Sequence, residues 1–393
     1  MRSRRPLGAT PSVAVVMPVR DEADHLAESV GAVLAQRYDG PLEVCLAVGP
    51  SSDGTERIAE DLASADHRVR VVANPEGTTP AGLNAAISAT SGEVVVRVDG
   101  HAVLPEGYVA RAVELLAETG ADNVGGVMAA VGDTPFTRAV ATAMTSRFGT
   151  GDARFHTGGP PGPVDTVYLG VFRRDTLERV GLYDPSLVRA QDAELNHRIR
   201  VDGGVVYFHP DLEVTYRPRS SLPALARQYF HYGRWRRVVV RRHPDSLAWR
   251  QAIPPATLLG LIGGVVLGLT GRRIGWLAPA GYAAATLGVS AAEGRDLDPV
   301  AQRWLPLAYA TMHLSWAAGF LTSPSDLAAP EAWAAADDDP TAVDAGVSED
   351  PPAATVGTSE DPPAATLGTP TPAPAAGDSR DRRRHRADPE TER

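Results

Sequence analysis

Asp99 and His101 are the residues whose types and spacing first indicate chemistry in this chain. They stand two positions apart at the end of a mainly apolar run, residues 94–98. In an extended segment, side chains two residues apart leave on the same side, so this Asp and His could share one divalent cation. The alternative is an Asp that makes a turn at the end of a strand, with a His beside it. Taken alone, the stretch favours the turn.

More carboxylates follow two earlier apolar stretches. Asp21 and Glu22 come just after Val13–Val19, and Asp53 comes shortly after residues 43–48. Such continuous apolar runs are typical of buried parallel strands, and open α/β sheets bind ligands beyond the carboxyl ends of these strands. A repeatedly acidic edge suits a cation that neutralises a phosphate-bearing substrate. The sequence after the first stretch has neither a Walker phosphate loop nor a GxGxxG pattern, which argues against a kinase or a dehydrogenase.

The order of apolar and helical patterns predicts the elements that position these residues. Strands alternate with helices up to His101, which predicts an α/β fold with a parallel sheet and helices on both faces. Residues 205–209 and 213–217 predict two short strands in a hairpin around Pro210. The other expected strands are Val13–Val19, 43–48, Val69–Ala73, 93–98, Asn123–Ala130 and 166–173. The expected helices are Leu26–Leu34, 81–89, 106–118, 136–148 and 175–180, together with a helix that begins near residue 55.

Composition limits the class of protein. The chain has 393 residues and 43% hydrophobic content, enough for a large catalytic domain and a further part. Its one cysteine, Cys45, lies in an apolar run, which excludes a disulfide framework and predicts a buried small side chain. The formal net charge of -10 argues against nucleic-acid binding. The basic start lacks the apolar core of a secretory signal, so we expect the catalytic part in the cytoplasm.

Three nearly uncharged segments follow a basic and aromatic stretch that starts at Gln228. They cover residues 253–271, 274–292 and 305–323, each close to the ~20 residues that span a bilayer as a helix. Their position in series favours membrane association, with the preceding arginines on the cytoplasmic side. Because the segments are rich in Gly and Ala, a soluble helical domain is the alternative. Arg272 and Arg273 leave a re-entrant hairpin open as well.

The sequence therefore predicts four parts. Residues 1–11 form a flexible start, 12–244 the catalytic domain, 245–325 hydrophobic helices that are transmembrane or re-entrant, and 326–393 a tail. The tail is rich in Pro, Ala and acidic residues and contains an 11-residue repeat, 348–358 and 359–369, so it is predicted to be disordered.

The motifs taken together resemble the family 2 glycosyltransferases, which have the GT-A fold, a Rossmann-like nucleotide-sugar-binding domain. The matching stretches span residues 12–244 and are VVMPVRDE, SSDGT, GLNAAI, SGEVVVRVDGH, AQDAEL and QYFHYGRW. Within the family the chain is most similar to bacterial membrane-associated enzymes that build exopolysaccharide, the succinoglycan type in particular. The apolar C-terminal segments suit that subgroup.

The resemblance implies a role for each matching residue. Asp192 stands where the family has its general base, and Asp99 and His101 stand where it has the DxD metal motif. The nucleotide-sugar donor would be bound by Asp21, Glu22, Asp53, Asn84, Arg97, Asp99, Gln228, Arg234 and Trp235. The residues leave alternatives open, since Asp192 could cap a helix and Trp235 could anchor the chain at a membrane interface.

The chain departs from the family pattern in three places. His101 replaces the usual second Asp, and since His suits Mn²⁺ better than Mg²⁺, we expect a divalent metal with Mn²⁺ favoured. Gly49 and Pro50 replace a frequent acidic pair. Gln228 and Arg234 are farther apart than in the strict QxxRW motif.

The resemblance implies an inverting transferase that moves a hexose from a nucleotide sugar, expected to be a UDP-sugar, to a lipid-linked or polysaccharide acceptor. It would act in cell-envelope or exopolysaccharide synthesis at the cell membrane, with its catalytic domain in the cytoplasm. A metal and an Arg can both stabilise the leaving diphosphate, and one base can take the acceptor proton. The alternatives are a nucleotidyltransferase of similar fold and a non-catalytic membrane scaffold.

Overall fold

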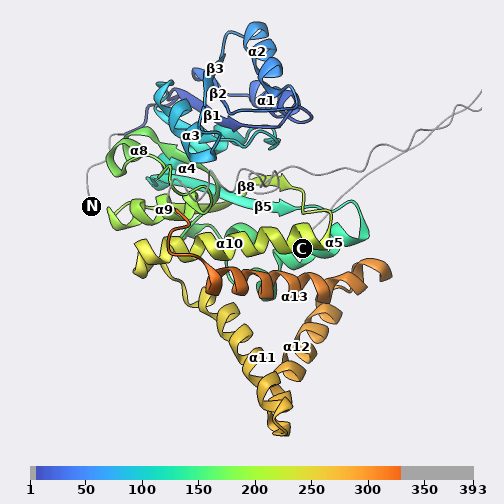
Figure 1. The fold of residues 1–393 in the computed structure, drawn as a ribbon. Coiled ribbons are helices and arrows are strands. Elements are labelled where there is room, and N and C mark those ends of the chain that lie inside the picture. Colours follow the sequence, from blue (N-terminus) through green and yellow to red (C-terminus); the bar gives the residue numbers. More distant parts are fainter. Residues whose placement is uncertain (1–5, 329–393) are drawn as a thin grey trace, which may run out of the picture. The chain divides into compact units, whose positions relative to one another are not determined.

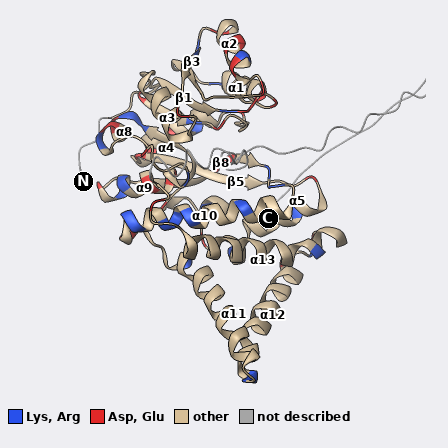
Figure 2. Ribbon diagram, viewed as in Figure 1, with Lys and Arg blue, Asp and Glu red and all other residues tan. Residues whose placement is uncertain are grey.

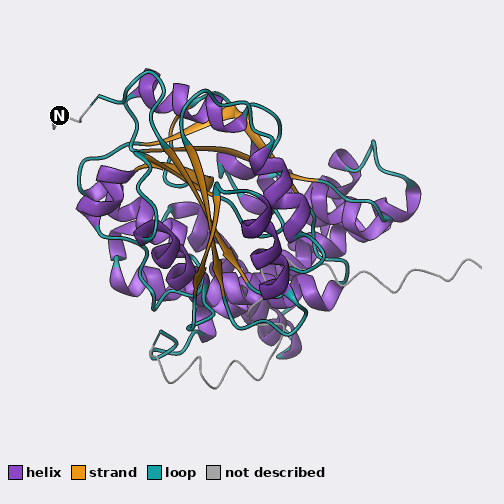
Figure 3. Ribbon diagram, turned by 90° about the horizontal axis from the view of Figure 1, so that it is seen from above, coloured by secondary structure: helices purple, strands orange, loops and turns teal. Residues whose placement is uncertain are grey.

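The structure is a computed structural model that describes residues 6–328, so the expected tail with its repeat lies outside the described residues. An eight-stranded sheet forms its centre, in the order β3-β2-β1-β4-β7-β5-β8-β6 (Figure 1). Seen from above, helices lie on both sides of this twisted sheet (Figure 3). The predicted α/β class is confirmed.

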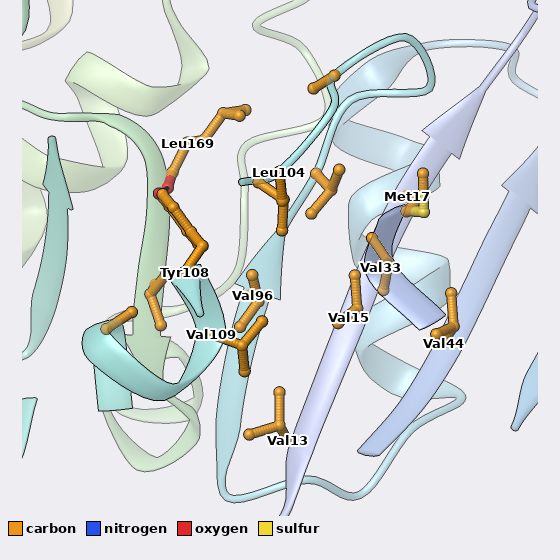
Figure 4. Close-up of a cluster of buried hydrophobic side chains, with 14 of the residues drawn as sticks. Val13, Val15, Met17, Val33, Val44, Val96, Leu104, Tyr108, Val109 and Leu169 are labelled. Carbon is orange, nitrogen blue, oxygen red and sulfur yellow. Dashed lines mark hydrogen bonds between the residues drawn. The ribbon is translucent and has the colours of Figure 1, made fainter. Parts of the chain in front are cut away.

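The N-terminal half of the sheet is parallel, and its strands other than the edge strand β3 are largely buried on both faces. It comprises β1 (Val13–Val19), β2 (Leu42–Val48), β3 (Val69–Ala73) and β4 (Val94–Arg97), joined through α1 (Leu26–Leu34), α2 (Thr55–Ala65) and α3 (Thr79–Ser88). Because side chains alternate across a strand, Val13 and Val15 pack towards α1 and α4 (Tyr108–Thr119), while Val16 packs towards α3. Figure 4 shows the first of these clusters. Cys45 is buried as predicted, and burial raises the pKa of its thiol to about 11.

The second half of the sheet is mixed rather than all parallel. β5 (Asn123–Ala130) pairs in parallel with β8 (Val206–Tyr216), whereas β7 (Tyr168–Arg173) lies between β4 and β5 and runs antiparallel to both. The short strand β6 (Gly162–Pro163) closes the edge. The helices α8 (Arg174–Val180) and α9 (Gln191–Val201) follow β7 in the chain. The predicted parallel pairing is therefore confirmed for the strands before His101, and the strands after it form a mixed sheet.

The predicted hairpin around Pro210 was wrong. Residues 206–216 form one strand, and both of its ends pair with β5 across a shift in register between Gly125 and Val127. Pro210 lies in this irregular stretch, where a missing backbone donor is tolerated. Gly126 is required there, because a Cβ at that position would lie 1.7 Å from the Leu212 carbonyl oxygen. The turn residues marked a bulge and not a chain reversal.

A helical layer packs against β5 and β8. It contains α5 (Pro135–Thr145), α10 (Leu222–Arg242) and α13 (Pro299–Thr322), with the short helices α6 (Arg147–Thr150) and α7 (Arg154–Thr157) at its side. The helices α10 and α13 lie side by side and approach closely at Gly233 and Gly319. Tyr309 and Met312 of α13 are buried in this layer. The third apolar segment, expected as a membrane span, is therefore largely a helix packed against the predicted catalytic domain, residues 12–244.

The two other apolar segments form a hairpin. The helices α11 (Ile253–Leu269) and α12 (Leu277–Glu293) leave the helical layer and meet near η3 (Arg273–Trp276) (Figure 1). The hairpin is almost free of charge except at its tip (Figure 2). Many of its large apolar side chains are exposed, including Leu259, Ile262 and Val266. In residues 6–328 one helix, Trp249–Leu269, which includes η2 (Trp249–Ala252), is long and apolar enough to cross a membrane.

Candidate active site

The loops after β1 and β2 bring three predicted donor residues together. Asp21 has a left-handed backbone (φ 51°), and its carboxylate accepts the Ser52 N–H at 2.8 Å. The Glu22 N–H donates to Thr55 Oγ1 at 2.8 Å. Asp53 Oδ2 accepts the Ala23 N–H at 2.9 Å, and its other oxygen accepts from the Thr55 N–H and hydroxyl. Burial raises the pKa of Asp53, but these hydrogen bonds more than offset it and lower the pKa below its usual value. Asp53 thus fixes the shape of both loops.

His101 lies against the first loop. Its Nδ1 is 2.8 Å from Glu22 Oε1, and the Glu22 side chain is 8% exposed. Gly100 permits this contact, because a Cβ there would lie 2.8 Å from Glu22 Cγ. A metal-bound His usually donates its second ring nitrogen to a carboxylate, which orients the ring. With Nδ1 on Glu22, a metal ion would be bound through Nε2.

Arg97 joins the two carboxylates expected to act in chemistry. Its guanidinium donates to Asp99 Oδ1 at 2.9 and 3.1 Å and contacts Asp192 Oδ1. The Arg97 side chain is 7% exposed, and that of Asp192 is 35% exposed. Burial alone lowers the pKa of Arg97, yet Asp192 and Asp99 raise it well above its ordinary value. Arg97 therefore keeps its charge and holds Asp192, from α9, beside the end of β4.

Asp192 is not the cap of α9. The cap residue is Ala190, which has a left-handed backbone (φ 60°), and no side chain caps this helix end. Asp192 lies in the first turn, where the helix dipole favours a negative charge. Its carboxylate points to Arg97 and leaves the capping position unused.

Asn84 and Tyr183 support this arrangement. The Asn84 amide donates to the Tyr183 carbonyl at 2.8 Å and accepts the Tyr183 N–H at 3.0 Å, so it ties α3 to the segment before α9. Tyr183 is buried, and burial together with the charge of Asp192 raises the pKa of its hydroxyl. No sequence pattern indicated Tyr183, apart from its position between two expected elements.

The three predicted residues of α10 do not share one surface. Gln228 is buried, and its Nε2 donates to the Tyr216 hydroxyl at 2.8 Å. Trp235 is buried in a cluster with Leu187, in the segment before α9. The Arg234 guanidinium lies over the Phe230 ring, 5.6 Å from its centre. The Trp235 ring is packed inside the protein and does not form an interfacial anchor.

The residues that follow β4 include two side chains of the types that bind a divalent cation. Within residues 6–328 no group of three or more His, Cys, Asp or Glu side chains could hold a metal ion. Asp99 and His101 supply two ligands of suitable type, and the Glu22 contact orients the His ring. Further ligands would have to come from a diphosphate or from water.

Comparison with known proteins places these residues in a family. The Glycosyl transferase family 2 profile matches residues 14–181. The succinoglycan biosynthesis protein ExoA of Rhizobium meliloti (strain 1021) is 31% identical over 318 residues, covering 79% of this chain and 94% of the relative. The chain belongs to glycosyltransferase family 2. It is a nucleotide-sugar-dependent glycosyltransferase of the exopolysaccharide type, which removes the nucleotidyltransferase and scaffold alternatives.

Two other similarities are more distant. One relative is a glucuronosyltransferase of Methanococcus voltae whose name includes dolichyl N-acetyl-α-D-glucosaminyl phosphate. It is 20% identical over 266 residues, which cover 65% of this chain and 82% of the relative. Among solved structures, the mannosyltransferase PcManGT of Pyrobaculum calidifontis, in complex with GDP-Man and Mn²⁺, has a TM-score of 0.52 at 20% identity and covers 81% of this chain and 90% of its own. The likeness confirms the GT-A fold of this family 2 glycosyltransferase.

Proposed function

We propose that this glycosyltransferase moves a hexose from a UDP-sugar to a lipid-linked saccharide or polysaccharide, with inversion at the anomeric carbon. The acceptor hydroxyl oxygen forms a bond to the anomeric carbon, while the bond from that carbon to the diphosphate oxygen breaks. The nucleoside diphosphate leaves with the electron pair, and Asp192 takes the hydroxyl proton. The contact of Arg97 with both Asp99 and Asp192 supports this proposal most strongly, since it joins the donor motif to the base.

The donor residues divide into two groups by what they touch. Asp21 and Asp53 shape the loops that would receive the nucleotide. Asp99 and His101 would hold a divalent metal, Mn²⁺ in preference to Mg²⁺, which would supply positive charge to the leaving diphosphate. The Mn²⁺ and GDP-Man in PcManGT support this assignment.

Arg97 positions the base in this scheme. Its contact with Asp192 Oδ1 fixes the carboxylate, and Oδ2 would take the hydroxyl proton. Asn84 and Trp235 act at a distance from the reaction, by holding Tyr183 and the segment before α9. Gln228 and Arg234 remain proposed donor or acceptor contacts on α10.

The hairpin α11 and α12 would hold the enzyme at the cell membrane, with the catalytic domain in the cytoplasm. The exposed apolar side chains of both helices support this placement. We expect the triple variant Leu259→Glu, Ile262→Glu and Val266→Glu to leave the membrane fraction on sedimentation, because charge on this face opposes insertion. Wild-type protein that stays soluble and monodisperse without detergent would contradict the placement.

Asp192→Asn tests the reaction. The variant should lose transfer by about 100-fold or more, as removal of a general base does, and keep its affinity for UDP. Asp24→Asn changes an exposed carboxylate of the β1 loop and is the matched control. Transfer by Asp192→Asn within tenfold of wild type would refute the base assignment. Pyrophosphate release in place of UDP would refute glycosyl transfer itself.

A further inference from the structure

A cavity of about 680 Å³ lies where the catalytic domain meets the hairpin. Its walls come from α6 and α7, from α10 and α13, and from the start of α11, with Tyr282 of α12 on one side. It is distinct from the loops after β1, β2 and β4, because none of their residues lines it. None of the residues that the sequence analysis assigned to the donor, the metal or the base lines this space, although Tyr229 and Tyr232 of the QYFHYGRW stretch do.

The cavity carries an excess of positive charge. Four arginines, Arg147, Arg200, Arg236 and Arg250, line it together with two carboxylates, Asp152 and Asp165. Arg250 contacts both carboxylates, at 3.1 Å for Asp152. Arg250 thus pairs directly with both carboxylates of the lining, and the charge of Asp165 also raises the pKa of Arg236, against the effect of burial, without a direct ion pair.

Arg236 is the buried cation that remains. It is 8% exposed, and its guanidinium donates to Gln251 Oε1 at 3.0 Å and to the Ser246 carbonyl. Within the described part of the chain, no carboxylate lies within 4.0 Å of it. Burial lowers the pKa of Arg236 to about 10, so the group is still charged at pH 7. A buried charge of this kind is stabilised by an anion.

The remaining walls are apolar and lead to the hairpin. Phe148, Met312 and Trp316 line the interior, and Trp249 and Ile253 lie at the start of the hairpin, 72% and 50% exposed. The exposed apolar faces of α11 and α12 continue from these two residues. A ligand that suits both regions has an anionic group for Arg236 and a long hydrocarbon chain for the hairpin.

The cavity also touches α9, the helix that carries the proposed base. Ala193, which follows Asp192 in α9, lines it, as does Thr166. An anionic group held at Arg236 would therefore be near the helix that carries the base. Such a ligand could present a sugar hydroxyl to Asp192 while its lipid part follows the hairpin.

We propose that this cavity binds the phosphate and the first isoprenoid units of a polyprenyl-phosphate-linked acceptor, with Arg236 as the main phosphate contact. This assignment rests on the proposed function, since it names the site at which the lipid-linked acceptor is held. General anionic membrane lipids are the competing ligands, and the experiment separates the two.

The test is a binding titration of the full chain in detergent micelles. The probe is undecaprenyl phosphate, and the signal is tryptophan emission, because Trp249 and Trp316 line the cavity. Arg236→Gln should weaken binding by about tenfold or more, the effect of losing a hydrogen bond to a charged group. Arg227→Gln removes an exposed arginine from the same helix and should bind as wild type does.

A second pair of variants guards against a folding defect in Arg236→Gln. Thr257→Phe fills the cavity from α11 and should abolish saturable binding, while Ala256→Phe adds the same ring at an exposed, non-lining position of that helix. Equal affinities for Thr257→Phe and Ala256→Phe would overturn the assignment. Equal binding of undecaprenol, which lacks the phosphate, or of phosphatidylglycerol would overturn it too.

Failure of the inference and failure of the proposed function give different results. Sugar transfer to a polyprenyl-linked acceptor that is unchanged in Thr257→Phe would refute the cavity and keep the function. Cavity-dependent binding of undecaprenyl phosphate without any sugar transfer would refute the function and keep the cavity.

Discussion

Replacement of His101 by Asp would restore an ordinary DxD motif and yet destabilise this protein. His101 Nδ1 is 2.8 Å from the carboxylate of Glu22, which is 8% exposed. An Asp at position 101 would place a second carboxylate beside the first, with no donor between them. The neighbours that make His acceptable here therefore oppose the residue that the family pattern would suggest.

The size of the effect follows from the geometry. Two unit charges about 4 Å apart at an effective dielectric constant of about 20 repel by roughly 4 kcal/mol. Side-chain movement relieves part of this, so we expect a loss of about 2–4 kcal/mol in the free energy of unfolding. For a domain of about 200 residues, this corresponds to a fall of roughly 5–15 °C in Tm. Thermal unfolding monitored by tryptophan fluorescence measures it directly.

A second substitution separates the charge effect from a general packing defect. In His101→Asp with Glu22→Gln, the Gln amide can donate to the new carboxylate, so most of the lost Tm should return. The double variant should also work better with Mg²⁺ relative to Mn²⁺, because an oxygen ligand replaces nitrogen. A single variant as stable as wild type, or a double variant as unstable as the single one, would refute the proposed Glu22–His101 contact.

Three further predictions follow from other contacts. Arg97→Met should lower the free energy of unfolding, measured by urea denaturation, by about 2–3 kcal/mol. This loss is smaller than the loss expected when a fully buried ion pair is broken, because the Asp192 side chain is 35% exposed. Gly319→Ala should lower Tm, since its Cβ would lie 1.9 Å from the Phe230 carbonyl oxygen, whereas Gly288→Ala in α12, with open space around it, should not. Burial lowers the pKa of His156 to about 4, so between pH 6.5 and pH 4 the unfolded chain binds more protons than the folded one. The contribution of His156 to stability should therefore be complete above pH 6.5 and be lost as the pH falls towards 4. His156→Gln should make Tm depend less on pH over this range.

The strands of the N-terminal half could be predicted because burial on both faces produces unbroken apolar runs. Val13–Val19 is such a run and has the predicted bounds. Val69–Ala73 has the predicted bounds too, although it contains Arg70 and is a partly exposed edge strand. Pro210 was misleading, since proline marks a bulge as well as a turn. The third apolar segment was misleading for another reason. A helix packed on one side against α10 has nearly the composition of a membrane span, and only its tertiary contacts distinguish them.

The candidate site was partly predictable for a similar reason. The carboxyl ends of parallel strands meet at one edge, so the grouping of Asp21 and Glu22 with His101 follows from strand order. The contact between Arg97 and Asp192 joins residues 95 positions apart, and local patterns carry no information about it. The structure likewise gives Asn84 a positioning contact with the Tyr183 backbone, which spacing could not indicate.

The arginines of α10 show why a charge cluster in sequence is not one surface in space. The sequence places Arg236, Arg237, Arg241 and Arg242 together with Arg234, and all five were expected on the cytoplasmic side of a membrane. In the structure Arg237 lies over the Phe320 ring, Arg241 donates to the carbonyls of Ser323 and Pro324, and Arg242 contacts Asp184 at 2.5 Å.

These contacts join α10 to the end of α13 and to the segment before α9. Arg236 differs from its three neighbours, because it points into the cavity with neutral partners. Its neighbours fix the helix, so that Arg236 remains the cation available to a ligand. The basic stretch thus has two physical roles, to hold α10 in place and to present one buried charge, and only the second calls for an anion from outside the protein.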